Sequence, residues 1–468
     1  MTGIVHKALV KETASNKPNA ATAFNLPDSA VAPARSFDTA FASGDLVPYN
    51  ASNGTDWEDG IGTFTAGTPD TLTRSVILES STGSAIDFSA GADVVLRVVW
   101  PASIATEADL LMRSAVPGGR LTLASGKPDY QPLNTVSVSG QDTTADTITV
   151  TAHTWSVGTM VKSSATSGGL TAATQYYAGN ITTDTISLHT TLATALAGTS
   201  KVDITGAVTA NITANGVANT SIYYAPYNHN LISLWNGYRW KTVEFSETEL
   251  ALGTLTASKP YDIYGYLNAG VLSLELLAWT SDTVRATEIT RQDGRWCKSG
   301  DKTRLLLGTL YTDSTTSTQN SKEKLYLANI HNILDFFMDV RESAASWTYS
   351  VGSFRQVNGN TQNQVDFICP QNNWVVEVFS KFRVNNNTST YRVAFSGIGI
   401  DSTTVSSGSN AGVWVTSTDL GQQTITSYKG LINTGKHFVA ALEAGAGSDT
   451  QTWFGSSLQQ VLAAIIGY

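Results

Sequence analysis

The sequence of 468 residues carries a formal net charge of -9, with 41% hydrophobic and only 14% charged residues. This composition excludes a disordered chain, and the acidic balance without any basic run excludes a nucleic-acid-binding surface. The length predicts about three to four domains, and the many Thr, Ser, Gly and Asn residues favour strands and tight turns over helix bundles. We therefore expect a mainly β protein.

Neither the start of the chain nor its most apolar run predicts secretion or a membrane span. The first residues, MTGIVHKALVKETASNKP, lack the apolar core of a signal peptide, and the run VVLRVVW is interrupted by Arg97 and stopped by Pro101. Cys297 and Cys369 stand far apart and cannot form a disulfide framework. We therefore expect free thiols in a protein made in a reducing cytoplasm.

The first candidate site is an acidic stretch near the N-terminus. Three acids surround one tryptophan: Asp56, Trp57, Glu58 and Asp59. An EF-hand calcium loop needs ligands at alternating positions, but the third of these is Gly60, so that ligand is missing. A glycosidase pair fits the composition, since two carboxylates suffice. The favoured interpretation is a turn made by Gly60 and Gly62, in which the tryptophan packs and the acids form a solvated rim.

Strand patterns recur along the chain and predict an N-terminal β module over residues 1–118. Alternating segments such as DVVLRVVW and GRLTLAS are bounded by turn residues. A short helix is expected at Thr106–Arg113, between two prolines. Further along, Asn236–Gly237 and Asn268–Gly270 predict two β-hairpins, because Asn and Gly accept the positive φ of type I′ turns.

A shift in composition predicts an insertion. Residues 133–212 are rich in Thr, Ala and Gly and lack Arg, Glu and Phe, whereas the segments on either side resemble consecutive strands of one domain. We therefore expect a small inserted β module within an interrupted β domain that is formed by residues 119–132 and 213–320, since loops tolerate insertions.

One segment has helical periodicity. In SKEKLYLANIHNILDFFMDVRES the apolar residues recur at near-helical spacings, and Ser321 is suited to be the N-cap. This predicts a linking helix at residues 321–345, which packs on a neighbouring sheet or forms a self-association seam. After it, the clean alternation of WVVEVFSKFRV and YRVAFSGIGI predicts a C-terminal β-sandwich over residues 346–468.

No assembled catalytic or metal-binding motif is present in the sequence. GLINTGK (430–436) has the spacing of a phosphate-binding loop, but His437 follows where Ser or Thr is needed and the flanking segments are strands, so we expect a turn. The six histidines lack metal-ligand spacing: His6, His153, His189, His229, His331 and His437. Cys369 is expected to be a packed thiol rather than a nucleophile. We expect no catalytic residue, cofactor or metal.

The candidate contact residue is Trp414. It follows the polar loop DSTTVSSGSN and lies in the strand pattern AGVWVTST, which predicts an exposed aromatic residue at a tip. Aromatic side chains on β surfaces stack on sugar rings, although most tryptophans and tyrosines in this chain are expected in cores or cross-strand pairs.

The first hundred residues resemble a module that recurs in virion proteins of tailed bacteriophages. The likeness rests on the early KET, the GTDWE-x-GIGTFT turn, the LTRSVILESS strand and the DFSAGADVV strand that ends in PAS; Asp59 departs from the apolar residue expected at its position. The interrupted domain, with SIYYAPYNHNLISLWNGYRW, is similar to a region of phage fibre-like proteins. The insert (HTWSVGTMV) and the C-terminal part (SWTYSVGSFRQVNG) resemble further phage structural modules.

This resemblance implies a non-enzymatic tail-fibre or tail-tip component of the virion, assembled in the host cytoplasm as a symmetric homo-oligomer, with a trimer favoured. The N-terminal module would attach to other virion proteins, and the C-terminal sandwich would contact a host-surface glycan or protein. No nucleic-acid or membrane partner is implied. Two alternatives remain: a capsid-bound head fibre or decoration protein, and a surface-polysaccharide depolymerase, which the lack of a long parallel β-helix pattern disfavours.

Overall fold

The computed structural model describes residues 10–98, 117–131, 133–151, 153–237, 240–408, 410–416, 422–455 and 460–467. Across these ranges strands dominate, accompanied by two short helices, α1 (Phe37–Ala40) and α4 (Leu192–Ala197), and the 3₁₀ turn η1 (Val357–Gly359). The prediction of a mainly β protein is confirmed. The chain forms two compact units, Met1–Ser114 and Ala115–Tyr468. The helix expected at Thr106–Arg113 lies outside the described residues.

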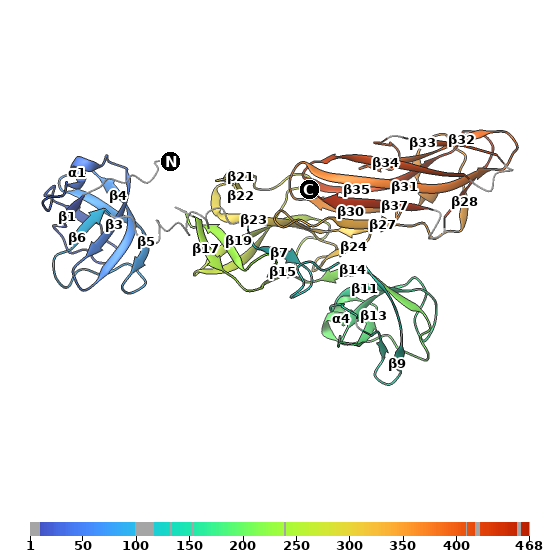
Figure 1. Cartoon of the computed structure of the whole chain (residues 1–468), viewed down its shortest axis with the longest axis horizontal. Helices are drawn as coiled ribbons and strands as arrows, with labels where there is room; N and C mark the ends of the chain where they lie inside the picture. The colour runs from blue at the N-terminus through green and yellow to red at the C-terminus, as the bar shows by residue number, and fades with distance from the viewer. Residues whose placement is uncertain are drawn as a thin grey trace. The chain divides into compact units, whose positions relative to one another are not determined.

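The first unit is a six-stranded antiparallel sheet that curls into a near-closed barrel (blue in Figure 1). Two backbone bridges, Val10 with Arg35 and Glu12 with Ala30, tie its first strand to the chain that follows the strand at the opposite edge. Phe24, Tyr49 and Phe64 fill its core. The strands pair in the order β1 (Lys11–Thr13), β6 (Val95–Val98), β3 (Leu46–Ser52), β4 (Trp57–Thr65), β5 (Asp70–Ser80) and β2 (Phe24–Leu26).

The glycines of the GIG sequence lie inside β4, and the predicted turn at these positions is wrong. A Cβ atom at Gly60 would come within 2.5 Å of the Val76 carbonyl oxygen and 2.7 Å of the Tyr49 hydroxyl. At Gly62 a Cβ atom would lie 2.6 Å from the Leu72 side chain. Both glycines are therefore packing positions at which neighbouring side chains cross the strand.

The second unit begins with the interrupted domain, which is built around Ile222, Ile232, Ile263 and Leu305. Its first layer pairs β7 (Gly119–Thr122), β15 (Ser221–Pro226) and β18 (Thr248–Ala251), next to the hairpin β16 (Leu231–Trp235) and β17 (Trp240–Glu244). Its larger sheet pairs β20 (Val271–Ala278), β19 (Pro260–Asn268), β23 (Asp301–Tyr311), β22 (Arg295–Lys298) and β21 (Ile289–Gln292), with β26 (Leu327–Asn329) added on β23.

Both predicted hairpins are confirmed. Trp235 pairs with Trp240 across the first turn, which leaves four residues between the strands, and only Gly237 of the Asn236–Gly237 pair has a positive φ, so this is not the expected type I′ turn. At the second turn Asn268 pairs with Val271, and the two residues between them, Ala269 and Gly270, have φ values of 49° and 84°. Two successive positive φ values are the signature of a type I′ turn, whose twist matches that of the flanking strands.

Residues between Val136 and Ala214 enclose a hydrophobic core of their own (green in Figure 1). The helix α4 starts at Thr191, whose side chain accepts from the Thr194 N–H, and stops at Gly198 with φ 67°. The strands of this module are β8 (Thr135–Ser137), β9 (Gly140–Asp142), β10 (Thr147–Thr149), β11 (Thr159–Ser163), β12 (Gln175–Gly179), β13 (Thr185–His189) and β14 (Asn211–Asn219).

The linking helix predicted at residues 321–345 is wrong, because this segment forms strands. Leu325, Tyr326 and Ala328 enter the core of the C-terminal sandwich, whereas Leu327 enters that of the interrupted domain. The segment is therefore buried on both of its faces. Its apolar residues are for this reason closely spaced, as they are in a buried helix. Further on, Phe336–Val340 alternates with period two. The strands around this segment are β24 (Thr318–Ser321), β25 (Lys324–Leu325), β26 and β27 (Phe336–Val340).

The C-terminal part is a sandwich of two sheets (orange to red in Figure 1), whose core includes β25 and β27. One sheet pairs β27, β37 (Val461–Gly467), β31 (Trp374–Asn386), β36 (Gln451–Phe454) and β28 (Ser346–Thr348), with β34 (Gln422–Ile432) on β31. The other pairs β33 (Ala411–Val415), β32 (Arg392–Ile400), β35 (Gly435–Ala444), β30 (Gln364–Cys369), β25 and β24, with β29 (Arg355–Gln356) on β35.

Two features connect the sandwich to the other parts of this unit. Strand β24 pairs with β14, so the second sheet runs on into the inserted module. The buried Arg285 binds Asp262 through two nitrogens, at 2.7 and 3.1 Å, and also donates to the Pro370 carbonyl, which joins the interrupted domain to the start of the β30–β31 turn. The Asp282 carbonyl accepts from the Lys436 N–H at 2.9 Å at the same end of the sandwich.

Candidate functional site

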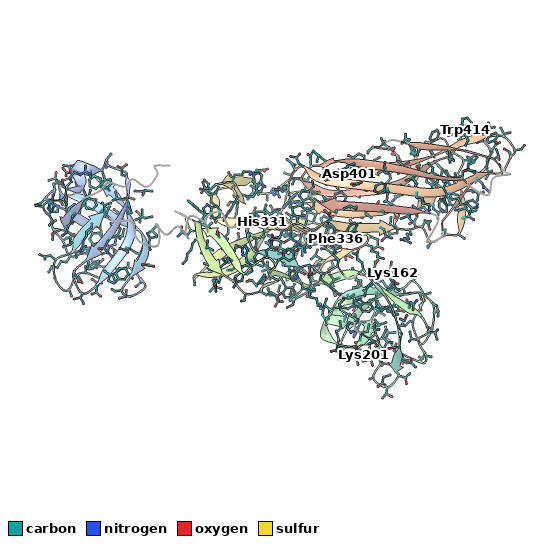
Figure 2. The ribbon with its side chains drawn as sticks, viewed as in Figure 1. Lys162, Lys201, His331, Phe336, Asp401 and Trp414 are labelled. Carbon is teal, nitrogen blue, oxygen red and sulfur yellow. The ribbon has the colours of Figure 1, made fainter. Side chains whose placement is uncertain are left out.

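Trp414 lies on the outer side of β33, an edge strand of the second sandwich sheet, and its side chain is 64% exposed. The alternation along the strand places Val413 and Val415 toward the sandwich core and the tryptophan outward. Figure 2 shows Trp414 toward one end of the sandwich and Asp401 toward the other. The aromatic ring is therefore presented at a strand edge, where no further strand of the sheet covers it.

Two further aromatic residues share this position. Trp414 is directly opposite Val393 on β32, and Phe395 pairs with Gly412, so these four residues lie on one face. Tyr391 comes directly before β32 and is 64% exposed. Diagonal neighbours on an antiparallel pair lie about 7–8 Å apart, within reach of aromatic rings. We call Tyr391, Phe395 and Trp414 the aromatic face.

The aromatic face lies at the end of the sandwich that is remote from the interrupted domain. On β35, Lys436 contacts the Asp282 carbonyl of that domain, whereas Ala444 pairs with Phe395. The eight residue steps from Lys436 to Ala444 span about 27 Å of extended chain. The aromatic face therefore lies away from this joint.

A fixed polar cluster lies at the start of β32, where Arg392 follows Tyr391 and points to the other side of the strand. Asp449 accepts from Arg392 Nε at 2.7 Å and from the Thr388 hydroxyl at 3.0 Å, and Asn386 Nδ2 also reaches it. The bond from Thr388 and the Arg392 contact lower the pKa of Asp449, so this carboxylate stays charged at neutral pH. The exposed aromatic rings by themselves suit the apolar face of a sugar ring.

The acidic stretch at Asp56–Asp59 is not a site, and its predicted solvated rim is wrong for Glu58. This side chain is fully buried; its oxygens accept from the Tyr49 hydroxyl and from the Ile86 N–H, both at 2.8 Å, and lie 3.3 Å from Arg74 Nε. Trp57 is 36% exposed rather than packed. The buried glutamate is thus a structural link between strands, and sequence reasoning missed it because its partners are distant in the chain.

The other candidates from the sequence are structural. GLINTGK forms the turn between β34 and β35, as expected, and Lys436 pairs with Asp366. Both ring nitrogens of His437 are engaged, with Asp401 at 2.7 Å and with the Asn433 carbonyl at 3.0 Å, so neither is free to act on a substrate. Cys297 and Cys369 are buried free thiols, and burial raises the pKa of both.

A hollow of about 820 Å³ lies between the inserted module and the sandwich. Charged side chains that line it pair with neighbours. Lys162 Nζ lies 3.8 Å from Glu323 Oε1, and Arg341 Nε lies 2.9 Å from Asp339 Oδ2. Because these charged side chains are already paired with one another, the hollow offers little to an ionic ligand. Lys162 and Lys201 mark the two sides of the inserted module in Figure 2.

One group of side chains could hold a metal ion. Within the described ranges, only Glu12, Asp28 and Asp38 bring three potential ligand atoms within 4.8 Å of one another. The sequence did not reveal this group, because its members are spread over 27 residues and follow no metal-binding spacing.

No protein-family model and no curated protein matches the chain. Among solved structures it has local similarity to latent PorU from Porphyromonas gingivalis, at 11% identity over 46% of this chain and 24% of that chain, with a TM-score of 0.21. The Cry4Aa toxin from Bacillus thuringiensis matches at 9% identity over 53% and 49%, with a TM-score of 0.17. The infectious bursal disease virus Gx strain structure matches at 8% over 75% and 73%, with a TM-score of 0.20.

The chain thus spans about a quarter of the PorU chain and about half of the toxin chain. At these TM-scores the likenesses support neither a shared fold nor a shared function. Across the parts of the chain that the structure describes, no helix is long and apolar enough to cross a bilayer.

Proposed function

We propose that the chain is a non-enzymatic component of a bacteriophage appendage, a tail fibre or tail tip, that binds a host-surface glycan through its C-terminal sandwich. The sequence resemblance of its successive modules to phage virion proteins supports the location. The observation that carries the binding role is the aromatic face, with Trp414 at 64% exposure on an edge strand. Large exposed aromatic groups that share one surface are typical of interaction sites.

Binding rather than catalysis is favoured by how two buried glutamates and His437 are used. Glu58 is paired with Arg74, Glu443 with Arg355, and His437 has no free nitrogen. An acid or base needs an unengaged group within reach of a substrate. If the alternative depolymerase activity existed, incubation of the protein with host capsule would release new reducing ends, and we expect none.

The binding role is tested by a single substitution, Trp414→Ala. The purified protein is screened against a panel of bacterial surface glycans and against whole host cells, and the affinity for the best ligand is measured. We expect the variant to bind about 10-fold or more weakly, because stacking on one aromatic ring contributes about 1.5 kcal/mol. Val405→Ala is the matched control, since Val405 is also 64% exposed and lies in the β32–β33 loop.

Equal affinity of Trp414→Ala and the wild type would overturn the assignment of this face. A deletion that starts at Trp347 is a poorer test, because it removes β37 and so leaves β27 without its partner strand. The proposed trimer, which rests on the same resemblance, is checked separately by light scattering of the full chain, where a monomer would contradict it.

A further inference from the structure

The seam at which the N-terminal barrel closes carries four carboxylates. Glu12 lies on β1 and bridges to Ala30, Asp28 follows β2, Asp38 lies on α1, and Asp70 begins β5 opposite Leu26. The two edges of the sheet therefore meet where four negative charges converge. This cluster belongs to the first unit, whereas the aromatic face belongs to the second, and it is not needed for the glycan-binding role proposed above.

Three of these groups have the geometry of a cation site. The ligand oxygens of Glu12, Asp28 and Asp38 all lie within 4.8 Å of one another. Calcium binds oxygens at about 2.3–2.6 Å, so one ion spans ligand atoms up to about 5 Å apart. Magnesium requires shorter bonds, near-ideal octahedral geometry and retained waters, which a set of carboxylates from separate segments suits less well.

The second observation is a pair of buried oxygens without partners. Glu12 has no exposed surface; its Oε1 accepts from the Phe37 N–H at 2.7 Å, but its Oε2 has no hydrogen-bond partner. Asp70 is 3% exposed; its Oδ1 accepts from the Gly67 N–H at 2.6 Å, and its Oδ2 meets no donor, while its carboxyl lies within hydrogen-bond distance of the Asp28 carboxyl. An unsatisfied buried carboxylate oxygen is costly, so each of these atoms calls for a ligand.

The mutual repulsion of the acids agrees with this geometry. Four carboxylates gathered at one seam repel one another when they are ionised. A divalent cation would replace this repulsion by attraction and would let all four groups remain ionised.

We propose that the N-terminal barrel binds one calcium ion at this seam, with Glu12, Asp28 and Asp38 as direct ligands and Asp70 as the fourth carboxylate around it. The ion joins β1, the segment after β2, α1 and the start of β5, and so clamps the two sheet edges. The two edge strands, β1 and β2, are each only three residues long, so they form only short backbone ladders. The ion adds a connection between the sheet edges that these ladders do not supply. The ion thereby stabilises the closure of the barrel at this seam.

The test uses the full chain after treatment with a chelator. Calcium chloride is titrated by calorimetry, and hydrogen exchange of peptides from β1, α1 and β5 is followed with and without the ion. We expect one site per chain, with a Kd of about 10⁻⁴ M, as in extracellular calcium modules, and slower exchange of these peptides. Magnesium chloride at the same concentration should neither fill the site nor slow the exchange.

Three variants separate a ligand role from a purely structural one. Asp28→Asn and Asp38→Asn change exposed groups and should weaken calcium binding about 10-fold or more, while the barrel stays folded. Asp93→Asn, an exposed acid of the same unit paired with Lys17, is the control and should bind like the wild type. The proposal is overturned if the wild-type chain binds no calcium at millimolar concentrations, or if Asp28→Asn and Asp38→Asn bind it as tightly as Asp93→Asn.

Discussion

The barrel and the C-terminal sandwich each bury a glutamate beside an arginine, but they differ in how exposed this arginine and the aromatic residues are. In the barrel, Arg74 stacks over Phe24 at 4.6 Å, inside the core, and is 5% exposed on its side chain. In the sandwich, Arg355 stacks over Tyr349 at 3.8 Å and remains 33% exposed, while Tyr391 and Trp414 face solvent. The barrel therefore keeps its arginine–aromatic stack inside the core, whereas the sandwich presents exposed aromatic residues on a contact surface.

The difference extends to how the two glutamates hold their surroundings. Glu58 accepts from groups of one sheet and of the loop that follows it, so it closes the barrel on itself. Glu443 on β35 accepts from Trp347 Nε1 on β28 at 2.7 Å, and from Arg355 Nε and the Asn358 N–H at 2.9 and 3.1 Å. Because β35 and β28 belong to different sheets, Glu443 is a polar link across the sandwich.

The largest effect is expected for Glu58→Ala, which would destabilise the core of the barrel. The substitution leaves Arg74 buried without its counter-charge and the Ile86 N–H and Tyr49 hydroxyl without an acceptor. Removing one partner of a buried pair costs about 3–5 kcal/mol. We expect peptides of β4 and β5 to lose hydrogen-exchange protection by about 100-fold or more, while β31 and β35 of the sandwich keep theirs.

The control for this experiment is Glu79→Ala, since Glu79 is an exposed acid on β5 of the same barrel. Its exchange should match that of the wild type. Unchanged protection of β4 and β5 in Glu58→Ala would mean that the buried pair does not stabilise the barrel, and the comparison with the sandwich would fail.

A smaller, pH-dependent effect is expected at Glu443. Burial raises its pKa from 4.5 to about 7, against the opposing effects of Trp347 and Arg355. Since the folded state binds the proton more tightly than the unfolded state, this group stabilises the fold fully below pH about 4.5, and the contribution is lost as pH rises through about 7. The loss amounts to about 3 kcal/mol.

The measurement is the urea dependence of proteolysis of the sandwich at pH 4.5, 6 and 7.5. Other acids of the sandwich, among them Glu342, Asp401 and Asp449, have lowered pKa values and give the opposite slope. Glu443 is therefore isolated as the difference in unfolding free energy between the wild type and Glu443→Gln, whose amide mimics the protonated acid and does not titrate. The wild type should lose stability relative to this variant, by up to about 3 kcal/mol, as pH rises from 4.5 to 7.5. A pH-independent difference would contradict the raised pKa.

The contrast between the two regions also explains what the sequence predicts well. The β class and both hairpins follow from local signals: alternation of apolar residues and Asn or Gly at positions of positive φ. The helix at residues 321–345 fails because Leu325 and Leu327 serve different cores, and single-chain periodicity cannot assign a run that is buried on both sides. Here the tertiary context overrides the local pattern.

The candidate site residues likewise divide into those that local sequence patterns predict and those that depend on tertiary contacts. The exposed position of Trp414 is readable because strand alternation and a polar loop are both local. Its companions Tyr391 and Phe395 were missed, although the alternation in YRVAF places them on one face. The contacts of Glu58 and the carboxylate cluster around Glu12 are formed by residues from several segments of the chain. No spacing in the sequence predicts that these residues lie close together.

The smallest expected effects sharpen the picture of the aromatic face itself. Phe395 is 37% exposed and its ring covers Gly412, with a Cβ atom at that glycine 2.8 Å from the ring, so it is partly engaged in the sheet. Tyr391, at 64%, is free to contact a ligand to the same degree as Trp414. If all three rings contact one glycan, Tyr391→Ala should weaken binding about 5-fold and Phe395→Ala about 2-fold, since each contributes about 0.5–1 kcal/mol. A larger loss for Phe395→Ala than for Tyr391→Ala, measured on the ligand that Trp414 requires, would place the binding surface further along β32 rather than at its start.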